Sequence, residues 1–478
     1  MFGSLILGAG PGGTGPLVWA AQNGKLQSWL AAGVAIVDRS DAMGGTLGRY
    51  AINSDSFGGA YLECLDAAPA RELFMPLRSD PVTRELEPMR HGLPPLELVD
   101  RYLHRLGDRL REIVSQHPGS RFFPRTEARA LHLRADGTVV AETVGRDGSI
   151  VPIEARTAIM ALGGRQDRSS YLGAELMPGV RLAAIDPEKI IPSDALMTAQ
   201  GQSRMAALLE RGGRRRVLIL GGSHSAFSIA WVLTNMVTGL DFGPGDIAIL
   251  HRRPPRIFYE SEDAAAADGY DVAKCDVCPR TRRVNRLGGL RGNGREMWRR
   301  LARRPGTIAE ERVVMLPLAD PHLSSATLRT MLDEAAVIVP AFGYRASTVP
   351  IFDAEARRLP LRADCGGPAV GRDARVLLAD GGQLPNVFGI GLGTDFRPWG
   401  KMGGEPSFDG QANSLWLYQN DIGAVVYRGV QECLGGGGIP RPTWQEGRLV
   451  GALARALRAG AAERRVADDA AQTDVAVS

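Results

Sequence analysis

The chain opens with a short apolar strand that leads directly into a glycine-rich turn, and this feature constrains the fold more than any other. Residues 2–7 are apolar enough for a buried strand, and Gly-Ala-Gly-Pro-Gly-Gly follows at residues 8–13, ahead of a helical pattern. In a strand–turn–helix unit with this G-x-G-x-x-G spacing, Gly8 permits the tight turn, Gly10 lets a pyrophosphate approach the backbone, and Gly13 lets the helix pack against the strand.

A second apolar strand, residues 33–37, ends at Asp38, which lies 25 residues beyond Gly13. In dinucleotide-binding folds a carboxylate near this place accepts hydrogen bonds from ribose hydroxyls. The unit therefore predicts a parallel α/β sheet. It also predicts a dinucleotide at the start of the helix, where backbone amides and the helix dipole hold the phosphates.

The same unit recurs in altered form in the middle of the chain. A strand at residues 216–220 leads into a turn that begins at Gly221, and a helical pattern follows the turn. Ser223 and Ala226 replace the second and third glycines, so this turn alone would be a weak signal. Its repetition of the first unit favours a second Rossmann-like domain.

Two arginines end the second strand of this later unit. Residues 246–250 form that strand, and Arg252 and Arg253 stand where the first unit has Asp38. A carboxylate would repel a 2′-phosphate, whereas guanidinium groups bind one in a bidentate manner. The second unit therefore favours NADPH over NADH. The alternative is that both arginines are simply solvated ahead of Pro254.

Between and after the two units the chain has the patterns of a β-meander, three further strands and a helix. These segments are residues 127–148 for the meander, 157–162, 335–340 and 387–390 for the strands, and 409–427 for the helix. With these segments the chain resembles the flavoproteins with two dinucleotide-binding domains, in which an NADPH domain interrupts an FAD domain. The resemblance covers about residues 2–50, 120–260 and 335–430.

That resemblance implies an α/β fold with two Rossmann-like domains, a small β-meander and a helical insert at about residues 66–118. It places the FAD domain at residues 1–185 and 335–445, the NADPH domain at 186–334, and a C-terminal helix with a disordered tail at 446–478. The residues implied to bind FAD are Gly8, Gly10, Gly13, Asp38, Gly45, Gly391 and Asp395. Those implied to bind NADPH are Gly221, Ser223, Ala226, Arg252 and Arg253.

Cysteine usage separates the branches of this group. Disulfide reductases of the group carry a redox cysteine pair against the flavin, and no such pair follows Asp38 or precedes the second turn. Cys275 and Cys278 lie about 50 residues beyond that turn, and two unpaired thiols or one regulatory disulfide account for them better than half of a zinc site.

The chain looks most like the single-component flavin monooxygenases that hydroxylate an amine nitrogen of ornithine or lysine. Ala341-Phe342-Gly343-Tyr344 stands where those enzymes carry an A-T-G-Y turn, and the Baeyer–Villiger fingerprint is absent before the second turn. The resemblance implies an FAD- and NADPH-dependent monooxygenase that uses molecular oxygen through a flavin hydroperoxide. Its substrate would be a small amine or amino acid. The alternatives are an NADPH-dependent flavin reductase or oxidase with another acceptor, and a non-catalytic nucleotide-binding protein.

Charge and hydropathy narrow the remaining functions. The net charge of +4 is too small for bulk binding of nucleic acid, although ten arginines lie between residues 280 and 304. Those arginines are consistent either with a binding site for an anionic ligand or with a helix face exposed to solvent. No stretch approaches the roughly 20 apolar residues of a membrane span, so a soluble cytoplasmic protein without a metal site is expected.

The insert at 66–118 fits a substrate cap or a contact in a homo-oligomer.

Overall fold

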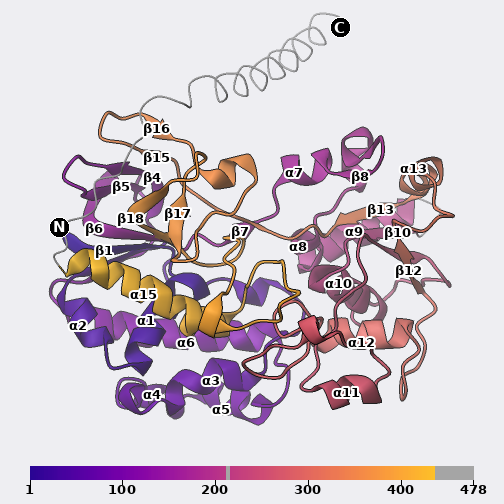
Figure 1. The fold of residues 1–478 in the computed structure, drawn as a ribbon, viewed down its shortest axis with the longest axis horizontal. Coiled ribbons are helices and arrows are strands. Elements are labelled where there is room, and N and C mark those ends of the chain that lie inside the picture. The colour runs from indigo at the N-terminus through magenta and orange to yellow at the C-terminus, as the bar shows by residue number, and fades with distance from the viewer. Residues whose placement is uncertain (212–215, 436–478) are drawn as a thin grey trace, which may run out of the picture.

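The computed structural model describes residues 1–211 and 216–435 and contains two α/β domains that lie side by side (Figure 1). The first domain holds a ten-stranded sheet in the order β16-β15-β4-β5-β6-β1-β2-β3, with β18 beside β6 and β17 beside β18. The second holds a four-stranded sheet in the order β12-β11-β10-β13. The helix and tail expected at 446–478 lie outside the described residues.

The first domain is built from two stretches of the chain. Its strands are β1 (Phe2–Leu7), β2 (Val34–Val37), β3 (Arg121–Phe123), β4 (Glu127–Leu133), β5 (Val139–Val144), β6 (Ile150–Met160), β15 (Ile351–Phe352), β16 (Arg358–Leu359), β17 (Arg375–Leu377) and β18 (Gln383–Gly389). Its helices are α1 (Pro11–Gln22), α2 (Leu26–Ala31), α3 (Gly58–Asp66), α4 (Met75–Arg78), α5 (Pro81–Leu86), α6 (Leu96–Ser115), α14 (Leu415–Gln419) and α15 (Asp421–Leu434).

The second domain lies between those two stretches. Its strands are β10 (Val217–Leu220), β11 (Ile247–His251), β12 (Val313–Pro317) and β13 (Val337–Pro340). Its helices are α8 (Ser193–Leu196), α9 (Ala199–Arg211), α10 (His224–Asn235), α11 (Glu262–Ala267), α12 (Gly292–Leu301) and α13 (Ser325–Glu334).

The connections between the domains are themselves paired. On the way out, the chain forms β7 (Gly164–Arg165), α7 (Arg168–Gly173), β8 (Glu175–Met177) and β9 (Val180–Arg181). On the way back it forms β14 (Arg345–Ala346), which pairs with β7 in an antiparallel two-stranded ribbon. The outgoing and returning chains therefore lie against each other.

Both central sheets are buried on both faces, as continuous apolar strands predict. In β1, Ile6 faces a core under α1, α6 and α15, whereas Leu5 and Leu7 face a second core formed with the β-meander. In β10, Ile219 and Leu220 divide in the same way between two cores. β1 pairs in parallel with β2 and β6, and β10 with β11 and β13. The expected fold class is confirmed.

One domain boundary was placed wrongly. The strand expected at residues 335–340 was assigned to the returning FAD domain, but β13 pairs in parallel with β10, with Val337 opposite Val217. It is therefore a strand of the second sheet, and the first domain resumes after Pro340. A short apolar strand fits either sheet equally well, so its sequence does not reveal its neighbour.

The region from residue 66 to residue 118 is helical through much of its length. In its first half, Pro81 begins α5 behind the capping side chain of Asp80, which accepts a hydrogen bond from the Val82 amide at 2.9 Å. Proline favours the first turn of a helix because that turn needs no amide donor. The second half is α6, the crossover between the parallel strands β2 and β3. α6 is thus an integral part of the first domain.

Asp268 is a buried carboxylate that ties the second domain together. It is 6% exposed, lies 3.0 Å from an Arg299 nitrogen, and accepts a hydrogen bond from the Tyr259 hydroxyl at 2.8 Å. Asp268→Asn should lower the free energy of unfolding by about 3 kcal/mol because it removes the buried carboxylate that faces both Arg295 and Arg299 and leaves Arg299 with the less buried Glu296. Chemical denaturation followed by circular dichroism measures this change. Glu355→Gln, at an exposed ion pair, is the control and should have almost no effect.

Candidate active site

A cavity of about 2170 Å³ opens where the two domains meet. Most small-molecule pockets have about 300–1,000 Å³, so this one has room for several bound groups at once. Ten of the twelve residues predicted to bind a cofactor line it: Gly8, Gly10, Asp38, Gly45, Gly221, Ser223, Arg252, Arg253, Gly391 and Asp395. The other two, Gly13 and Ala226, are buried beneath their turns.

The first glycine turn is shaped by close backbone contacts. Gly8 has a φ of +100°, and a Cβ atom on it would lie 2.3 Å from the Ala161 carbonyl oxygen. A Cβ atom on Gly13 would lie 1.8 Å from the Gly8 carbonyl oxygen. Gly10 differs, because its nearest neighbour would be the Gly45 Cα at 3.7 Å. The turn thus packs tightly against the backbone at Gly8 and Gly13 and leaves open space at Gly10, as a phosphate cradle requires.

Asp38 stands at the end of β2 and holds this turn in place. One carboxylate oxygen accepts a hydrogen bond from the Ala9 amide at 2.6 Å, and the other accepts from the amide and hydroxyl of Ser40 at 2.8 and 2.7 Å. An ionised carboxylate offers about four acceptor positions. One position therefore remains for a ribose hydroxyl in the cavity.

The end of β18 completes the first half of the cavity. Gly391 has a φ of +121°, and no atom lies within 4 Å of the place where its Cβ would be. Asp395 has a φ of +57° and lies 3.6 Å from Arg397. A Cβ on Gly12 would lie 3.2 Å from the Ile390 carbonyl oxygen, so β18 ends against the start of α1. The open space on this side, beside the first glycine turn, fits FAD.

The second glycine turn repeats the first, but α10 lies far enough from its strand to accept a side chain at the third glycine position. Gly221 has a φ of +148°, and a Cβ on it would lie 2.5 Å from the Ala341 carbonyl oxygen. Ser223 is the N-cap of α10 and makes no side-chain cap bond. Ala226 is fully buried, so α10 accommodates a Cβ where α1 requires Gly13. The free amides at the start of α10 are a suitable phosphate site.

Arg252 and Arg253 lie at the rim beside that turn. The Arg252 guanidinium donates to the Glu175 carbonyl oxygen, and Arg253 forms an ion pair with Asp409 of the first domain at 2.5 Å. Arg253 remains 75% exposed at the side chain. Both side chains line the cavity, and both are also exposed to solvent.

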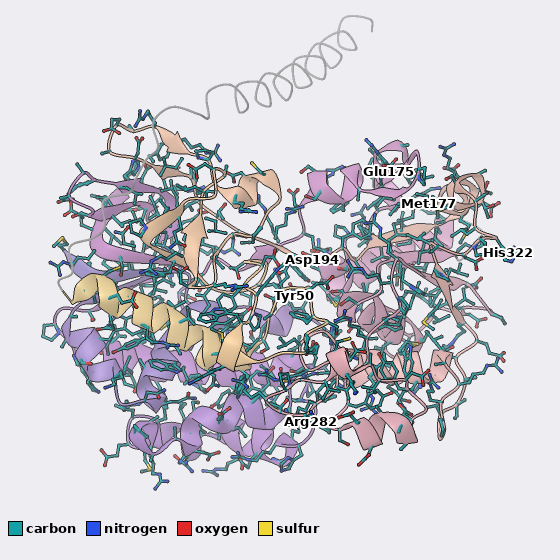
Figure 2. All side chains as sticks on the ribbon, viewed as in Figure 1. Tyr50, Glu175, Met177, Asp194, Arg282 and His322 are labelled. Carbon is teal, nitrogen blue, oxygen red and sulfur yellow. The ribbon has the colours of Figure 1, made fainter. Side chains whose placement is uncertain are left out.

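Eight of the ten arginines between residues 280 and 304 fall into two groups. On and after α12 they pair or stack: Arg295 over Tyr259, Arg299 on Asp268, Arg300 over Trp231 and Arg304 over Trp298. Ahead of α12, four of them line the cavity: Arg280, Arg283, Arg286 and Arg291. Arg282 is 72% exposed and lies at the edge of the molecule (Figure 2). The anionic-ligand interpretation therefore applies to the segment before α12.

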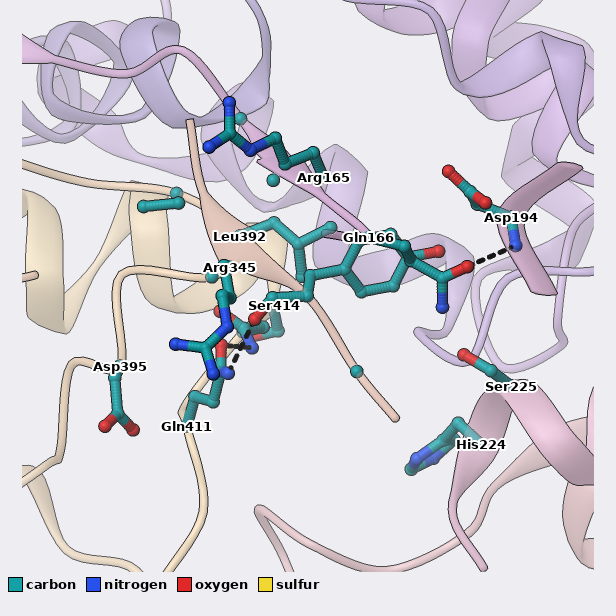
Figure 3. Close-up of a pocket in the computed structure, with 18 of the residues that line it drawn as sticks. Arg165, Gln166, Asp194, His224, Ser225, Arg345, Leu392, Asp395, Gln411 and Ser414 are labelled. Carbon is teal, nitrogen blue, oxygen red and sulfur yellow. Dashed lines mark hydrogen bonds between the residues drawn. The ribbon is translucent and has the colours of Figure 1, made fainter. Parts of the chain in front are cut away.

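Several side chains meet at the domain junction, and of those named here Asp395 had been predicted from the sequence. Tyr50 packs against the core of the second domain, and the Ala51 amide donates to the Met197 carbonyl oxygen at 2.9 Å. Figure 2 shows Tyr50 and Asp194 between the two domains. In the close-up, Gln166, Asp194 and His224 lie on one side of the pocket, and Arg345, Gln411 and Asp395 lie on the other (Figure 3). These residues come from distant parts of the chain.

The two cysteines of the C-x-x-C segment are free thiols, Cys275 exposed and Cys278 buried. Burial raises the pKa of Cys278, but hydrogen bonds from Thr281 and from nearby backbone amides outweigh it and bring the pKa to about 7. No group of three or more metal-ligating side chains occurs within residues 1–211 and 216–435. Across the same ranges no helix has the length and hydropathy to cross a membrane.

Solved structures of two enzymes share the fold. The ornithine N-hydroxylase of Kutzneria sp. 744 matches with a TM-score of 0.51 at 15% identity, over 90% of this chain and 99% of that one. The ornithine hydroxylase of Pseudomonas aeruginosa also matches with a TM-score of 0.51, at 12% identity, over 90% and 99%. This chain therefore shares the two-domain fold of these two ornithine hydroxylases.

A curated relative identifies the family. The CMP-5′-(3-aminopropyl)phosphonate hydroxylase of Streptomyces rubellomurinus is 31% identical over 439 residues, which are 89% of this chain and 97% of the relative. The chain belongs to the family of that hydroxylase. No protein-family model matches the chain.

Proposed function

We propose that the protein hydroxylates the primary amine nitrogen of a small molecule that carries a phosphonate or phosphate, as in a nucleotide-linked aminoalkylphosphonate. The reaction is R–NH₂ + O₂ + NADPH + H⁺ → R–NHOH + NADP⁺ + H₂O. One oxygen atom enters the new N–O bond, the other leaves as water, and NADPH supplies two electrons. The relative's substrate has this chemistry, and the neighbours of the same fold favour it over a reductase, an oxidase or a non-catalytic protein.

In this proposal the two turns hold the two cofactors. FAD lies along Gly8, Gly10, Gly13, Asp38, Gly45, Gly391 and Asp395. NADPH lies along Gly221, Ser223, Ala226, Arg252 and Arg253. The reduced flavin, when bound, supplies the activated oxygen. The chain itself must orient the amine and exclude water.

One observation carries the substrate assignment: beyond the two turns the cavity is lined by arginines, and Arg256 among them has an unused buried donor. Arg256 lines it and donates from Nη2 to the Ser407 carbonyl oxygen at 2.6 Å, whereas its Nη1 is shielded and lacks a partner among the described residues. A buried donor left unpaired costs about 1–3 kcal/mol. A phosphonate oxygen would satisfy it. Arg291 adds positive potential along the same wall, whereas Arg283 and Arg286 lie there within 2.8 Å of Glu260 and 4.0 Å of Asp421, respectively.

Arg256→Met should therefore raise the KM for the phosphonate amine at least tenfold, because it keeps the aliphatic packing and removes a charge-assisted bond worth about 1.5–3 kcal/mol. The rate at which NADPH reduces the flavin should change little. Steady-state kinetics and anaerobic stopped-flow absorbance measure the two quantities. Arg282→Met, at an exposed arginine outside the cavity, is the matched control and should leave both unchanged.

The function is tested by incubating the protein with FAD, NADPH and CMP-5′-(3-aminopropyl)phosphonate under ¹⁸O₂. The expected product is a hydroxylamine that gains one labelled oxygen, seen by mass spectrometry, with one NADPH consumed for each product. Omission of NADPH should abolish it. Consumption of NADPH with hydrogen peroxide as the sole oxygen product would instead establish an oxidase.

A further inference from the structure

The proposed hydroxylation requires a free lone pair on the substrate nitrogen. An alkylamine has a pKa close to that of lysine, about 10.4, so at neutral pH nearly all of it arrives as an ammonium ion with no lone pair. A group in the cavity must therefore bind the ammonium and take one proton from it. A general base must lie within hydrogen-bond reach of that proton and be unprotonated at the working pH.

Two side chains meet at the domain junction in an arrangement suited to this task. His224 is the first residue of α10, on the second turn, and Asp55 belongs to the loop between β2 and α3 of the first domain. The His224 Nε2 lies 3.6 Å from an Asp55 carboxylate oxygen. Both residues line the cavity, and His224 is seen at the pocket wall in Figure 3.

The His224 Nε2 is an unsatisfied polar atom. It is shielded from solvent and has no hydrogen-bond partner among the described residues, because 3.6 Å is too long for a bond to Asp55. The two atoms are close enough for one nitrogen placed beside them to lie within hydrogen-bond distance of both. An ammonium ion carries three donors, so it can donate to the carboxylate and to the imidazole together.

The loop that carries Asp55 is held firmly. The Ser54 amide donates to the Pro94 carbonyl oxygen at 2.8 Å, the Ser56 amide donates to the Ser54 hydroxyl oxygen at 2.9 Å, and that hydroxyl lies 2.6 Å from the buried Tyr61 hydroxyl. Asp55 itself is 58% exposed at the side chain, and in the described part of the chain its ion-pair partner is His224. Its carboxylate is thus positioned by the loop and open to a ligand.

The surroundings keep the imidazole neutral. Burial lowers the pKa of His224, the Arg291 guanidinium lowers it further, and Asp55 and a hydrogen bond with the Gly289 backbone act in the opposite direction. A neutral imidazole is the form that accepts a proton. Arg291 is occupied elsewhere, since it stacks 3.9 Å from the Phe258 ring centre and donates to the Arg286 carbonyl oxygen.

We infer that Asp55 binds the substrate's ammonium group and that His224 takes its proton before hydroxylation. This inference rests on the proposed function. The N–H bond of R–NH₃⁺ breaks, the proton goes to Nε2, and the electron pair stays on nitrogen. Asp55 then stabilises the imidazolium. The proton balances the one consumed when the second oxygen atom leaves as water, so the sum is R–NH₃⁺ + O₂ + NADPH → R–NHOH + NADP⁺ + H₂O.

The binding role is tested with two ligands that differ only in the amine. CMP-5′-(3-aminopropyl)phosphonate and CMP-5′-propylphosphonate are titrated into the oxidised, FAD-loaded protein by calorimetry. The wild-type protein should bind the amine at least tenfold more tightly than the propyl compound, and Asp55→Asn should bring this ratio close to one. Asp55→Glu should restore part of the ratio. An unchanged ratio in Asp55→Asn would overturn the assignment of Asp55.

The proton-accepting role is tested with His224→Gln, which keeps a polar side chain of similar length. At pH 7 this variant should consume NADPH but form at least tenfold less hydroxylamine for each NADPH. Raising the pH toward 9.5 should recover product, because the amine then arrives deprotonated. An analogue with fluorine beside the amine carbon, which lowers the amine pKa, should recover it at pH 7. Loss of product that neither change restores would overturn the role of His224.

Two controls distinguish a misfolded variant or a general loss of charge from a failure of the inference itself. Asp41→Asn removes an exposed carboxylate outside the cavity and should behave as wild type. FAD content shows that each variant is folded. If the wild-type protein forms no hydroxylamine from the amine ligand, the proposed function and this inference both fall. If wild type forms product and the variants match it in affinity ratio and pH profile, this inference alone falls.

Discussion

Gly13→Ala should yield a folded protein that is purified without FAD. The added Cβ would lie 1.8 Å from the Gly8 carbonyl oxygen and 3.2 Å from the Ile6 Cγ2, so α1 must move away from β1. Overpacking of this kind costs about 1–3 kcal/mol. A displaced α1 also withdraws its amides from the pyrophosphate, so we expect FAD affinity to fall by at least about a hundredfold.

The flavin absorbance of the purified protein, relative to its protein absorbance, measures this loss. Gly173→Ala is the control, because no atom lies within 4 Å of the Cβ it would add. Full FAD occupancy in Gly13→Ala would show that the first turn is a structural turn and no cofactor site.

Arg252→Ala combined with Arg253→Ala should reverse the preference between the nicotinamide cofactors. Each arginine can donate a charge-assisted hydrogen bond worth about 1.5–3 kcal/mol to the 2′-phosphate. The double variant should therefore lower kcat/KM for flavin reduction by NADPH at least a hundredfold. The value for NADH, which has no 2′-phosphate, should change by less than about threefold.

Anaerobic stopped-flow reduction with each cofactor makes this comparison, with Arg282→Ala as the control for a lost surface charge. Arg253 must leave Asp409 to reach a phosphate, so Asp409→Asn should strengthen NADPH binding modestly. Equal losses for NADPH and NADH in the double variant would mean that these arginines support the fold.

Local patterns allowed much of the fold to be predicted, because a strand, a glycine turn and a helix follow one another within a few residues. The apolar run of β1 and the turn after it needed no distant information. The partner of β13 could not be predicted, since 335–340 satisfies any parallel sheet. The prolines before α6 could not be assigned a role from the sequence, because proline suits a loop as well as the first turn of a helix, where Pro81 lies.

The cofactor side of the cavity was largely predictable, and the remainder was not. Ten of the twelve expected residues line it, because both turns lie at the carboxyl ends of parallel strands. Arg253 and Asp409 are 156 positions apart and meet only after both domains have formed. Asp55 and His224 lie in different domains, and neither stands in a motif that marks it as catalytic.

The ribbon of β7 and β14 makes the second domain a removable module. Arg165 lies opposite Arg345 across the antiparallel pair, so the chain leaves and re-enters the first domain at points about 5 Å apart. A two-residue turn can join such ends without disturbing either strand. A shortened protein made in this way would retain every strand of the first sheet.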